Sequence, residues 1–297
     1  MTAPRLSVVV PTYQRAELLD RCLAALAASE GADFEVIAVD DASTDATAEV
    51  LGSWLRRLPL TSLTQPANAG PAAARNRGID CAAGDLVLFI DDDVVVSPDL
   101  IATHLALHEQ AQDQQLAVLG RVDWHPSLRV TPFMRWLDRS GLQFSYDTWL
   151  REGPVDPPAA AFYTANLSIR RELLVAVGGF DERFPYPAYE DMELAHRLGA
   201  RGLRMDYRPA ALAWHARAID LATFRRRMAM VGTSAALLRT AAPDFPIDDA
   251  ALRGANRRRR DRLLLQVRAA LLRSDSARSE HYWAEVGHAY ATALARA

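Results

Sequence analysis

The sequence predicts an α/β fold with a doubly wound, mostly parallel central sheet, and three observations support this. Continuous apolar runs, rather than alternating ones, occupy residues 6–10, 34–39 and 86–90, as expected for strands that are buried on both faces. Patterns of helical period separate these runs, which favours parallel strands with helices covering the sheet. Acidic clusters follow two of the runs directly, and ligands of such sheets bind beyond the carboxyl ends of the strands.

The N-terminal third contains two strand and helix units. The first begins with a β-branched run, Leu6 to Val10, which ends at Pro11 and precedes apolar residues at helical spacing from Glu17 to Ala28. The second begins with Phe34 to Val39, and a turn rich in Ser, Thr and Asp leads from it to a helical pattern over Ala46 to Leu58. Segments that follow such strands meet at one edge of the sheet, so we expect them to form a common site.

A third unit follows, with a helix start at Pro71 inside the segment from Asn68 to Gly78. Proline is favoured at the first helical position because its fixed φ suits the helix and it has no N–H to leave unpaired. A helix N-terminus with Arg75 near it could attract phosphate, although arginines on a helix surface need no ligand to explain them. The strand Leu86 to Ile90 then leads into Asp91, Asp92 and Asp93.

The aspartate triplet is a candidate metal site. Three carboxylates at the end of a buried strand are costly unless a cation neutralises them. Oxygen ligands of this kind select Mg²⁺, Mn²⁺ or Ca²⁺, and Mg²⁺ or Mn²⁺ commonly takes substrate phosphates as its remaining ligands. The alternative is a solvated acidic turn, which the motifs further along the chain make less attractive.

The middle of the chain contains a helix and a long irregular segment. The pattern from Ile101 to Gln115 is helical and places His104 and His108 on one face, which could be a metal pair. Its Ala, Leu and Gln surroundings favour an ordinary helix face instead. Residues 124–158 are rich in aromatic side chains and proline and are predicted to be an irregular loop. We expect this loop to contact an acceptor.

A second acidic motif opens a later helix. Gly178 to Glu182 is followed by Glu190 to Gly199, whose first turn contains Glu190 and Asp191. Acidic residues favour the positive end of a helix, so a capping role alone is the alternative to a catalytic one. Leu203 to Trp214 is predicted to form two short strands around Pro209, and His215 follows.

After His215 the chain becomes rich in arginine. Leu221 to Arg239 and Asp261 to Leu272 are predicted to be amphipathic helices. Basic amphipathic helices can bind anionic membranes, but a helical cap with solvated arginines is the favoured interpretation. We therefore expect two parts, a catalytic domain over 1–215 and a helical extension over 216–297.

Composition excludes several functional classes. The chain has 297 residues, a net charge of −3 and no lysine, so all 34 basic residues are arginine. A nucleic-acid partner is therefore not expected, and P-loop and Schiff-base chemistry are excluded because both need an amine. Two cysteines and the lack of a signal-like segment favour a cytoplasmic protein, with the inner face of the membrane as an alternative place of action.

The ordered motifs resemble those of the family 2 glycosyltransferases, which have the GT-A fold. The resemblance covers Leu6 to His215, and five motifs in the family's order are more specific than any one of them. They are VVVPTYQR (Val8 to Arg15), VDDASTDAT (Val39 to Thr47), NAGPAAARNRGI (Asn68 to Ile79), GDLVLFIDDD (Gly84 to Asp93), and GGFDERF with YEDMELAHRLGARG (Gly178 to Gly202).

The resemblance implies roles for individual residues. Asp191 would be the catalytic base, with Glu190 in a supporting or acceptor-binding role, and Asp41 would contact the nucleotide base. The triplet would be the DXD motif, with Asp93 as the direct metal ligand, Asp91 near the metal and His215 completing the site in some relatives. The predicted nucleotide-binding residues are Pro11, Thr12, Tyr13, Arg15, Asp40, Asp41, Asn68, Arg75, Asp91 and Asp92.

The implied reaction is a metal-dependent single displacement with inversion. A sugar would move from a nucleoside diphosphate, UDP being the expected one, to a hydroxyl of a polysaccharide, glycolipid or small molecule. The implied cofactor is Mn²⁺ or Mg²⁺, because a divalent cation stabilises a diphosphate leaving group. A lipid-linked acceptor, peripheral membrane contact and a homodimer fit the same interpretation.

Three other interpretations stay open on the sequence. A retaining transferase can share a block like that at Gly178 to Glu182. A domain could bind a sugar nucleotide without turnover, although all the expected acidic positions are filled. A sugar-nucleotide pyrophosphorylase would carry a Gly-rich loop and a catalytic lysine after the first strand, and this chain has neither, which argues strongly against that class.

Overall fold

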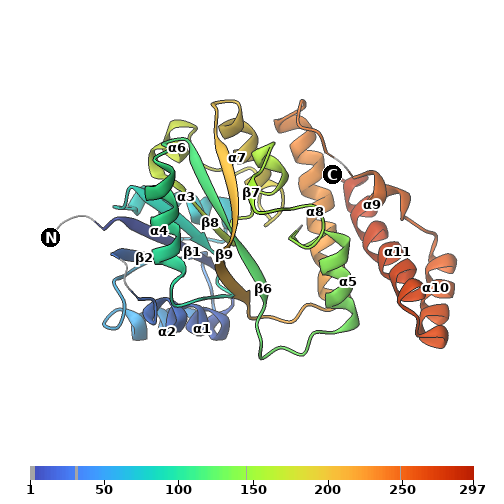
Figure 1. Ribbon diagram of the computed structural model, residues 1–297. Helices are drawn as coiled ribbons and strands as arrows, with labels where there is room; N and C mark the ends of the chain where they lie inside the picture. Colours follow the sequence, from blue (N-terminus) through green and yellow to red (C-terminus); the bar gives the residue numbers. More distant parts are fainter. Residues whose placement is uncertain (1–3, 31–32, 145, 248) are drawn as a thin grey trace.

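The computed structural model describes residues 4–30, 33–144, 146–247 and 249–297, and its centre is one mixed sheet (Figure 1). The strand order is β3-β2-β1-β4-β8-β6-β9-β5, and β7 pairs with β9 outside this path. The strands are β1 (Leu6–Thr12), β2 (Phe34–Asp40), β3 (Leu60–Thr64), β4 (Leu86–Ile90), β5 (Val94–Val96), β6 (Leu116–Trp124), β7 (Gly153–Pro154), β8 (Asn166–Arg170) and β9 (Arg204–His215).

Helices connect the strands and flank the sheet (Figure 1). Those within the sheet-forming part are α1 (Ala16–Ala27), α2 (Thr47–Trp54), α3 (Pro71–Cys81), α4 (Leu100–Ala111), α5 (Pro132–Ser140), the 3₁₀ turn η1 (Pro158–Ala160), α6 (Arg171–Ala176) and α7 (Glu190–Gly199). After β9 come α8 (Leu221–Ala241), α9 (Ala250–Gly254), α10 (Arg259–Leu272) and α11 (Asp275–Leu294).

The N-terminal half of the sheet confirms the predicted parallel α/β arrangement. Strands β3, β2, β1 and β4 run parallel, and β1, β2 and β4 are almost fully buried. Beyond β4 the sheet becomes mixed, because β8 lies antiparallel between β4 and β6, while β6 and β9 pair in parallel. The ends of β1, β2 and β4 therefore meet at one edge, as their continuous apolar sequences predict.

Two predictions about secondary structure are wrong. The segment around Pro209 is one strand, because β9 pairs with β6 on both sides of a register shift between Leu119 and Arg121. Proline has no N–H to donate to the neighbouring strand, and strands tolerate it at an irregularity of this kind, where the regular pairing is interrupted. The segment 124–158 is not entirely irregular, since it contains α5, whose first turn is capped by the Thr131 side chain. Helix α11 lies within the expected helical extension over 216–297, although no separate helix was predicted for its residues.

The hydrophobic side chains form a main core on both faces of the sheet and a second core among helices. The second core joins Phe133 and Trp136 of α5 to Phe224 of α8 and Tyr290 of α11. The predicted boundary at residue 215 stays a prediction, since α5 precedes it and shares this core. In the described ranges no helix is both long and apolar enough to span a membrane.

The histidine pair of α4 faces the sheet. His104 contacts the Ser168 hydroxyl at 2.8 Å and Asn166 Oδ1 at 2.9 Å, and His108 contacts the same hydroxyl at 2.8 Å. Burial lowers the pKa of each imidazole to about 4, so both are neutral at physiological pH. The pair therefore packs α4 on β8 through a buried polar network. Of the two cysteines, Cys22 is buried and Cys81 is exposed.

Candidate active site

The predicted convergence of the strand ends occurs around Asp92. Its carboxylate accepts a hydrogen bond from the Thr12 hydroxyl at 2.8 Å and another from Arg15 Nη1 at 2.7 Å. The same Arg15 nitrogen lies 3.1 Å from Asp93 Oδ2. Burial raises the pKa of Asp92 to about 6, although Arg15 opposes the shift. Segments eighty residues apart in sequence thus form one charged cluster at the edge of the sheet.

Asp93 lies at the centre of this cluster. Its Oδ1 lies 3.5 Å from His215 Nε2, and its Oδ2 lies 3.2 Å from Arg217 Nε in addition to Arg15. Burial alone would raise the pKa of Asp93, but His215, Arg15 and Arg217 together lower it below its usual value. Arg217 was missed by the sequence reasoning, although its place two residues after His215 at a strand end was a usable signal.

The Asp93 and His215 side chains offer one oxygen and one nitrogen to a divalent cation. No cluster of three or more metal-ligating side chains occurs in the part of the chain that the structure describes. Such a donor pair still fits Mn²⁺ or Mg²⁺ bound together with substrate phosphates, because these ions usually take only one or two protein ligands in phosphate sites. Asp91, predicted beside the metal, instead points to Arg75.

Arg75 connects the triplet to the second acidic motif. Its side chain is only 4% exposed, and it donates from Nη2 to Asp91 Oδ1 at 3.0 Å and from Nη1 to Glu190 Oε1 at 2.9 Å. The guanidinium also lies 5.7 Å from the centre of the Phe180 ring. Arg75 was predicted to face phosphate at a helix end, and that role stays a prediction. In the structure it holds the start of α7 against the end of β4.

Glu190 and Asp191 occupy the first turn of α7, as predicted. Glu190 is buried, and its Oε2 has no hydrogen-bond partner among the described residues. Burial and the neighbouring Glu190 charge raise the pKa of Asp191 to about 7, with Arg75 opposing them. For Asp191, burial thus outweighs the helix dipole, which acts in the opposite direction. A carboxyl group with a pKa near 7 suits a general base.

The two aspartates after β2 organise loops. Asp40 Oδ1 accepts from the Ser43 backbone N–H at 2.9 Å, and Asp41 accepts from the Gln65 amide and from the backbone N–H groups of Ala69 and Gly70 at 2.6–2.8 Å. Gly70 has a φ of 91°, and a Cβ there would lie 2.7 Å from the Pro185 carbonyl oxygen, so the tight loop requires glycine. Asp41 thus ties this loop to the sheet edge.

The remaining predicted nucleotide-binding residues differ in exposure. Thr12 is buried through its bond to Asp92, and Pro11 is half-buried at the end of β1. Tyr13 and Asn68 are exposed beside the same edge, the side chain of each free to meet a ligand from solvent. The structure therefore brings all the predicted residues to one edge of the sheet, although it tests none of their roles in binding.

A small cavity lies directly beside His215. It has a volume of about 50 Å³ and is lined mainly by acidic and aromatic side chains. Two buried lining atoms, the Tyr146 hydroxyl and Gln143 Oε1, have no hydrogen-bond partner among the described residues. Sequence reasoning did not single out these residues beyond placing acceptor contacts in their segment. The lining residues are Val122, Asp123, Trp124, Asp138, Gln143, Phe144, Tyr146, Asp147 and His215.

The charges of this cavity are only partly compensated. Arg121 pairs with Asp123 at 2.7 Å and with Asp147 at 2.9 Å, while Asp138 accepts from the Trp124 indole N–H at 2.9 Å. Burial raises the pKa of Asp138 above its usual value. The Trp124 ring also packs edge-on against His215, with ring centres 5.6 Å apart. The cavity thus presents hydrogen-bond acceptors and an aromatic wall next to the triplet.

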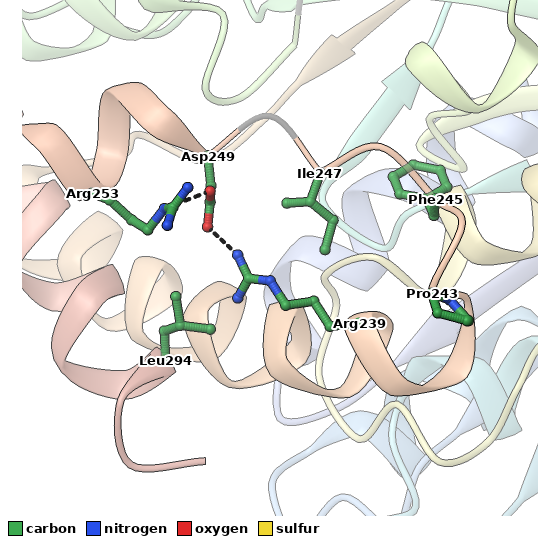
Figure 2. Close-up of a pocket in the computed structure, with 7 residues that line it drawn as sticks. All are labelled: Arg239, Pro243, Phe245, Ile247, Asp249, Arg253 and Leu294. Carbon is green, nitrogen blue, oxygen red and sulfur yellow. Dashed lines mark hydrogen bonds and ion pairs between the residues drawn. The ribbon is translucent and has the colours of Figure 1, made fainter.

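A larger cavity, of about 360 Å³, lies in the C-terminal helical part (Figure 2). Its buried carboxylate, Asp249, is bound by Arg239 at 2.6 Å, Arg253 at 2.8 Å and the Tyr290 hydroxyl at 2.6 Å. These contacts hold the segment after α8 against α11, so the carboxylate has a structural role. None of the residues that line this cavity belongs to the charged edge of the sheet.

Comparisons with known proteins identify the family. The sequence model "Glycosyl transferase family 2" matches residues 7–172, which is more than half of the chain. The chain belongs to glycosyl transferase family 2. It is 32% identical over 235 residues to validoxylamine A glucosyltransferase of Streptomyces hygroscopicus subsp. jinggangensis, an alignment that covers 68% of this chain and 53% of that protein. It is 31% identical over 242 residues to the pre-mycofactocin glycosyltransferase of Mycobacterium tuberculosis, covering 80% and 48%.

Solved structures of other proteins have the same fold. The mannosyltransferase PcManGT from Pyrobaculum calidifontis, in complex with GDP-Man and Mn²⁺, aligns with a TM-score of 0.63 at 21% identity, covering 99% of this chain and 88% of that one. S. aureus TarS 1-349 aligns with a TM-score of 0.59 at 16% identity, covering 98% and 90%. This family 2 glycosyltransferase therefore has the GT-A fold. It spans about half the length of the curated relatives that it matches.

Proposed function

We propose that this glycosyltransferase moves a sugar from a nucleoside diphosphate to an acceptor hydroxyl by a single inverting displacement. One observation carries the proposal: Asp191, with a pKa of about 7, is held next to the DXD-type triplet through the Glu190–Arg75–Asp91 bridge. A carboxyl group and a phosphate-binding edge are thereby fixed relative to each other. This is what attack by a deprotonated hydroxyl on an anomeric carbon requires.

The residues of the sheet edge have separate roles in this proposal. Asp93 and His215 would hold Mn²⁺ or Mg²⁺, which when bound supplies positive charge to the departing diphosphate. Arg15 and Arg217, now paired with Asp93, lie where they can also meet phosphate oxygens. Asp191 accepts the proton of the acceptor hydroxyl, and Glu190 beside it has a supporting role through its ion pair with Arg75. No covalent intermediate is needed.

The inverting and metal-dependent steps are testable with one assay series. UDP-, GDP- and dTDP-sugars should be screened with Mn²⁺, and the configuration at the anomeric carbon of the product determined by NMR. The solved GT-A neighbours include complexes with UDP, UDP-GlcNAc and GDP-Man, which makes UDP and GDP the first choices. Retention at the anomeric carbon would favour the retaining alternative, and binding without hydrolysis or transfer would favour a protein without turnover.

Nucleotide binding is expected to depend on Asp41. Replacing Asp41 by alanine removes the acceptor for the Gln65, Ala69 and Gly70 donors, so the loop beside the proposed base pocket loses its anchor. We expect nucleotide affinity, measured by calorimetry, to fall about tenfold or more, since three hydrogen bonds to a charged group are lost. Preference among sugars joined to the same nucleotide should not change. Unaltered affinity would place the nucleotide elsewhere.

The acceptor is expected to use the cavity beside His215. Tyr146→Phe removes a hydroxyl that lacks a partner in the described structure, so the free protein should be as stable as the parent or slightly more so. If an acceptor hydroxyl bonds this group, the KM for the acceptor should rise about fivefold to tenfold, because one hydrogen bond contributes roughly 1 kcal/mol. Validoxylamine A is a suitable first acceptor, given the relatives named for it. Tyr163→Phe, in the same aromatic cluster but outside the cavity lining, is the control.

A further inference from the structure

Helix α10 carries an apolar stripe on the side away from the protein. Leu265 and Ala269 are among its least exposed side chains, and Arg262 pairs with Glu285 of α11 at 3.1 Å. These three positions share one face at helical spacing, and this face packs on α11. Figure 1 shows α10 as the outermost helix at its end of the molecule. Its opposite face therefore meets solvent.

The solvent-facing side is unusually hydrophobic. Leu263, Leu264, Val267 and Leu271 lie within about 100° of one another around the helix and are 48–77% exposed. With Leu272, they are half of the large hydrophobic side chains that are exposed in the described part of the chain. They occur within a helix of 14 residues. A contiguous stripe of this kind indicates an interaction surface, because exposed apolar side chains on surfaces that face only water are usually scattered singly.

Two arginines adjoin the stripe. Arg259 precedes Leu263 by four residues and Arg260 precedes Leu264 by four, so both lie beside the leucines on the helix surface, whereas Arg268 pairs with Glu280 of α11 at 2.6 Å. The segment 253–273 contains eight arginines and one aspartate, whereas the whole chain has a net charge of −3. Basic side chains beside an apolar stripe are complementary in charge and polarity to a surface whose anionic groups cover an apolar layer.

We propose that α10 binds the surface of a membrane that contains anionic phospholipid. The leucine stripe would enter the boundary between headgroups and acyl chains, while Arg259 and Arg260 extend to the phosphates. Contacts between α10 and α11 hold the helix to the body, so its binding would bring the GT-A site to the membrane. The inference is independent of the proposed reaction, since it rests on none of the active-site residues.

A second copy of the chain is a poorer occupant of this face. Pairing two leucine stripes would bring the arginine rims of both copies together, and like charges juxtaposed at an interface oppose association. The only acidic residue between 253 and 273 is Asp261, so neither copy offers matching carboxylates from this segment. An anionic lipid surface satisfies both the apolar stripe and its charge.

Vesicle co-sedimentation of the whole chain tests the proposal. Vesicles of phosphatidylcholine with about one third phosphatidylglycerol should bind the protein at least tenfold more tightly than pure phosphatidylcholine, because each arginine near an anionic surface adds to the attraction. Raising salt from about 0.1 M to about 1 M should remove most of this difference. Arg259→Gln with Arg260→Gln should weaken binding to the anionic vesicles about tenfold.

The stripe itself is tested with Leu263→Gln, Leu264→Gln and Leu271→Gln together. These side chains are exposed, so the melting temperature should change little, while vesicle binding should fall at least tenfold. Leu55→Gln, an exposed leucine 51% accessible near α2, is the matched control and should bind like the parent. Transfer of sugar to a water-soluble acceptor should be unchanged in all four proteins.

Three results would overturn the proposal. They are absence of binding to anionic vesicles by the parent chain, undiminished binding by the triple leucine variant, and a concentration-dependent dimer that the triple variant abolishes. Sedimentation velocity measures the last of these. If neither the parent nor any variant transfers sugar to a soluble acceptor while the parent still binds vesicles, the proposed reaction is contradicted. The proposal that α10 binds membranes is then unaffected.

Discussion

Asp191→Asn is expected to lower turnover by about 10²–10⁴-fold while nucleotide binding survives. The amide keeps the shape of the side chain, and it can still accept the hydrogen bond from the Met192 backbone N–H, now 2.8 Å long. It cannot accept the proton of an acceptor hydroxyl. A capping role alone predicts nearly intact turnover, because asparagine caps a helix as well as aspartate.

The activity of the parent enzyme should increase with pH, because Asp191 acts as a base only when it is ionised. Burial and the Glu190 charge raise the pKa of Asp191 from 3.8 to about 7, so the base is largely protonated at pH 6 and ionised at pH 8. We therefore expect kcat/KM to rise about tenfold per pH unit below pH 7 and to level off above it. The residual activity of Asp191→Asn should lack this inflection.

Stability should change in the opposite direction to activity. Folding raises the pKa of the Asp191 carboxyl group, so this group lowers the free energy of unfolding as the pH increases from about 3.8 to about 7. In that range Asp191 is ionised in the unfolded chain but still protonated in the folded protein. Asn carries no such penalty, so the variant should melt at the same temperature as the parent or higher at pH 8. Thermal melts at pH 5 and pH 8 measure the difference, which should be larger at pH 8.

Asp181→Asn is the matched control for this experiment. Asp181 lies in the GGFDE segment and pairs with exposed Arg183 at 2.6 Å rather than with Arg75. Its turnover should stay within about twofold of the parent, because asparagine keeps the shape of the side chain and the lost ion pair involves an exposed arginine. Near-normal turnover of Asp191→Asn with saturating acceptor, or an equal loss in both variants, would remove Asp191 from the mechanism and make Glu190 the next candidate.

The sequence predicted the parallel half of the sheet well, for physical reasons. Strands β1, β2 and β4 are buried on both faces, so each is a continuous apolar run bounded by turn residues, and Pro71 marks the start of α3 directly. Helix α5 and strand β9 were predicted poorly. Their form depends on partners distant in sequence: α5 packs on α8 and α11, and β9 follows β6 through a register shift.

The candidate site shows the same division. The segments that meet were predictable, because the carboxyl ends of neighbouring parallel strands must lie together. The pairings were not, since nothing local states that Arg75 reaches Glu190, 115 residues later, or that Arg217 shares Asp93 with Arg15. The raised pKa of Asp191 could not be predicted for a related reason: the helix dipole can be inferred from the sequence, whereas burial is a property of the fold.

Asp93→Asn is expected to abolish the dependence of donor binding on divalent cation. In the parent, Mn²⁺ should raise the affinity for a nucleoside diphosphate at least tenfold, because Asp93 and His215 would hold the ion against the diphosphate. The amide is a poor ligand for such an ion and carries no charge. In calorimetry, affinities of the variant with Mn²⁺ and with a chelator should therefore agree within about twofold.

The arginines around Asp93 add a second, opposite expectation. Arg15 and Arg217 lie 3.1 and 3.2 Å from Asp93 Oδ2, and the variant frees both of them from a carboxylate. With a chelator present, the variant should therefore bind nucleoside diphosphate as well as the parent or better. Its fold should be less stable, because the half-buried Arg217 loses its carboxylate partner and Arg15 keeps only Asp92. If Asp93→Asn loses only the Mn²⁺-dependent part of its affinity for nucleoside diphosphate, the result indicates that Asp93 is a metal ligand.

Asp41→Ala completes the comparison, because it should weaken binding equally with Mn²⁺ and with the chelator and so keep the ratio of the two affinities. Melting temperatures of all three proteins identify any loss that comes from unfolding. If Asp93→Asn keeps the full tenfold response to Mn²⁺, the cation is held elsewhere. If the parent itself shows no response, Arg15 and Arg217 neutralise the diphosphate without a metal, and the buried Asp93 serves to position those two guanidinium groups.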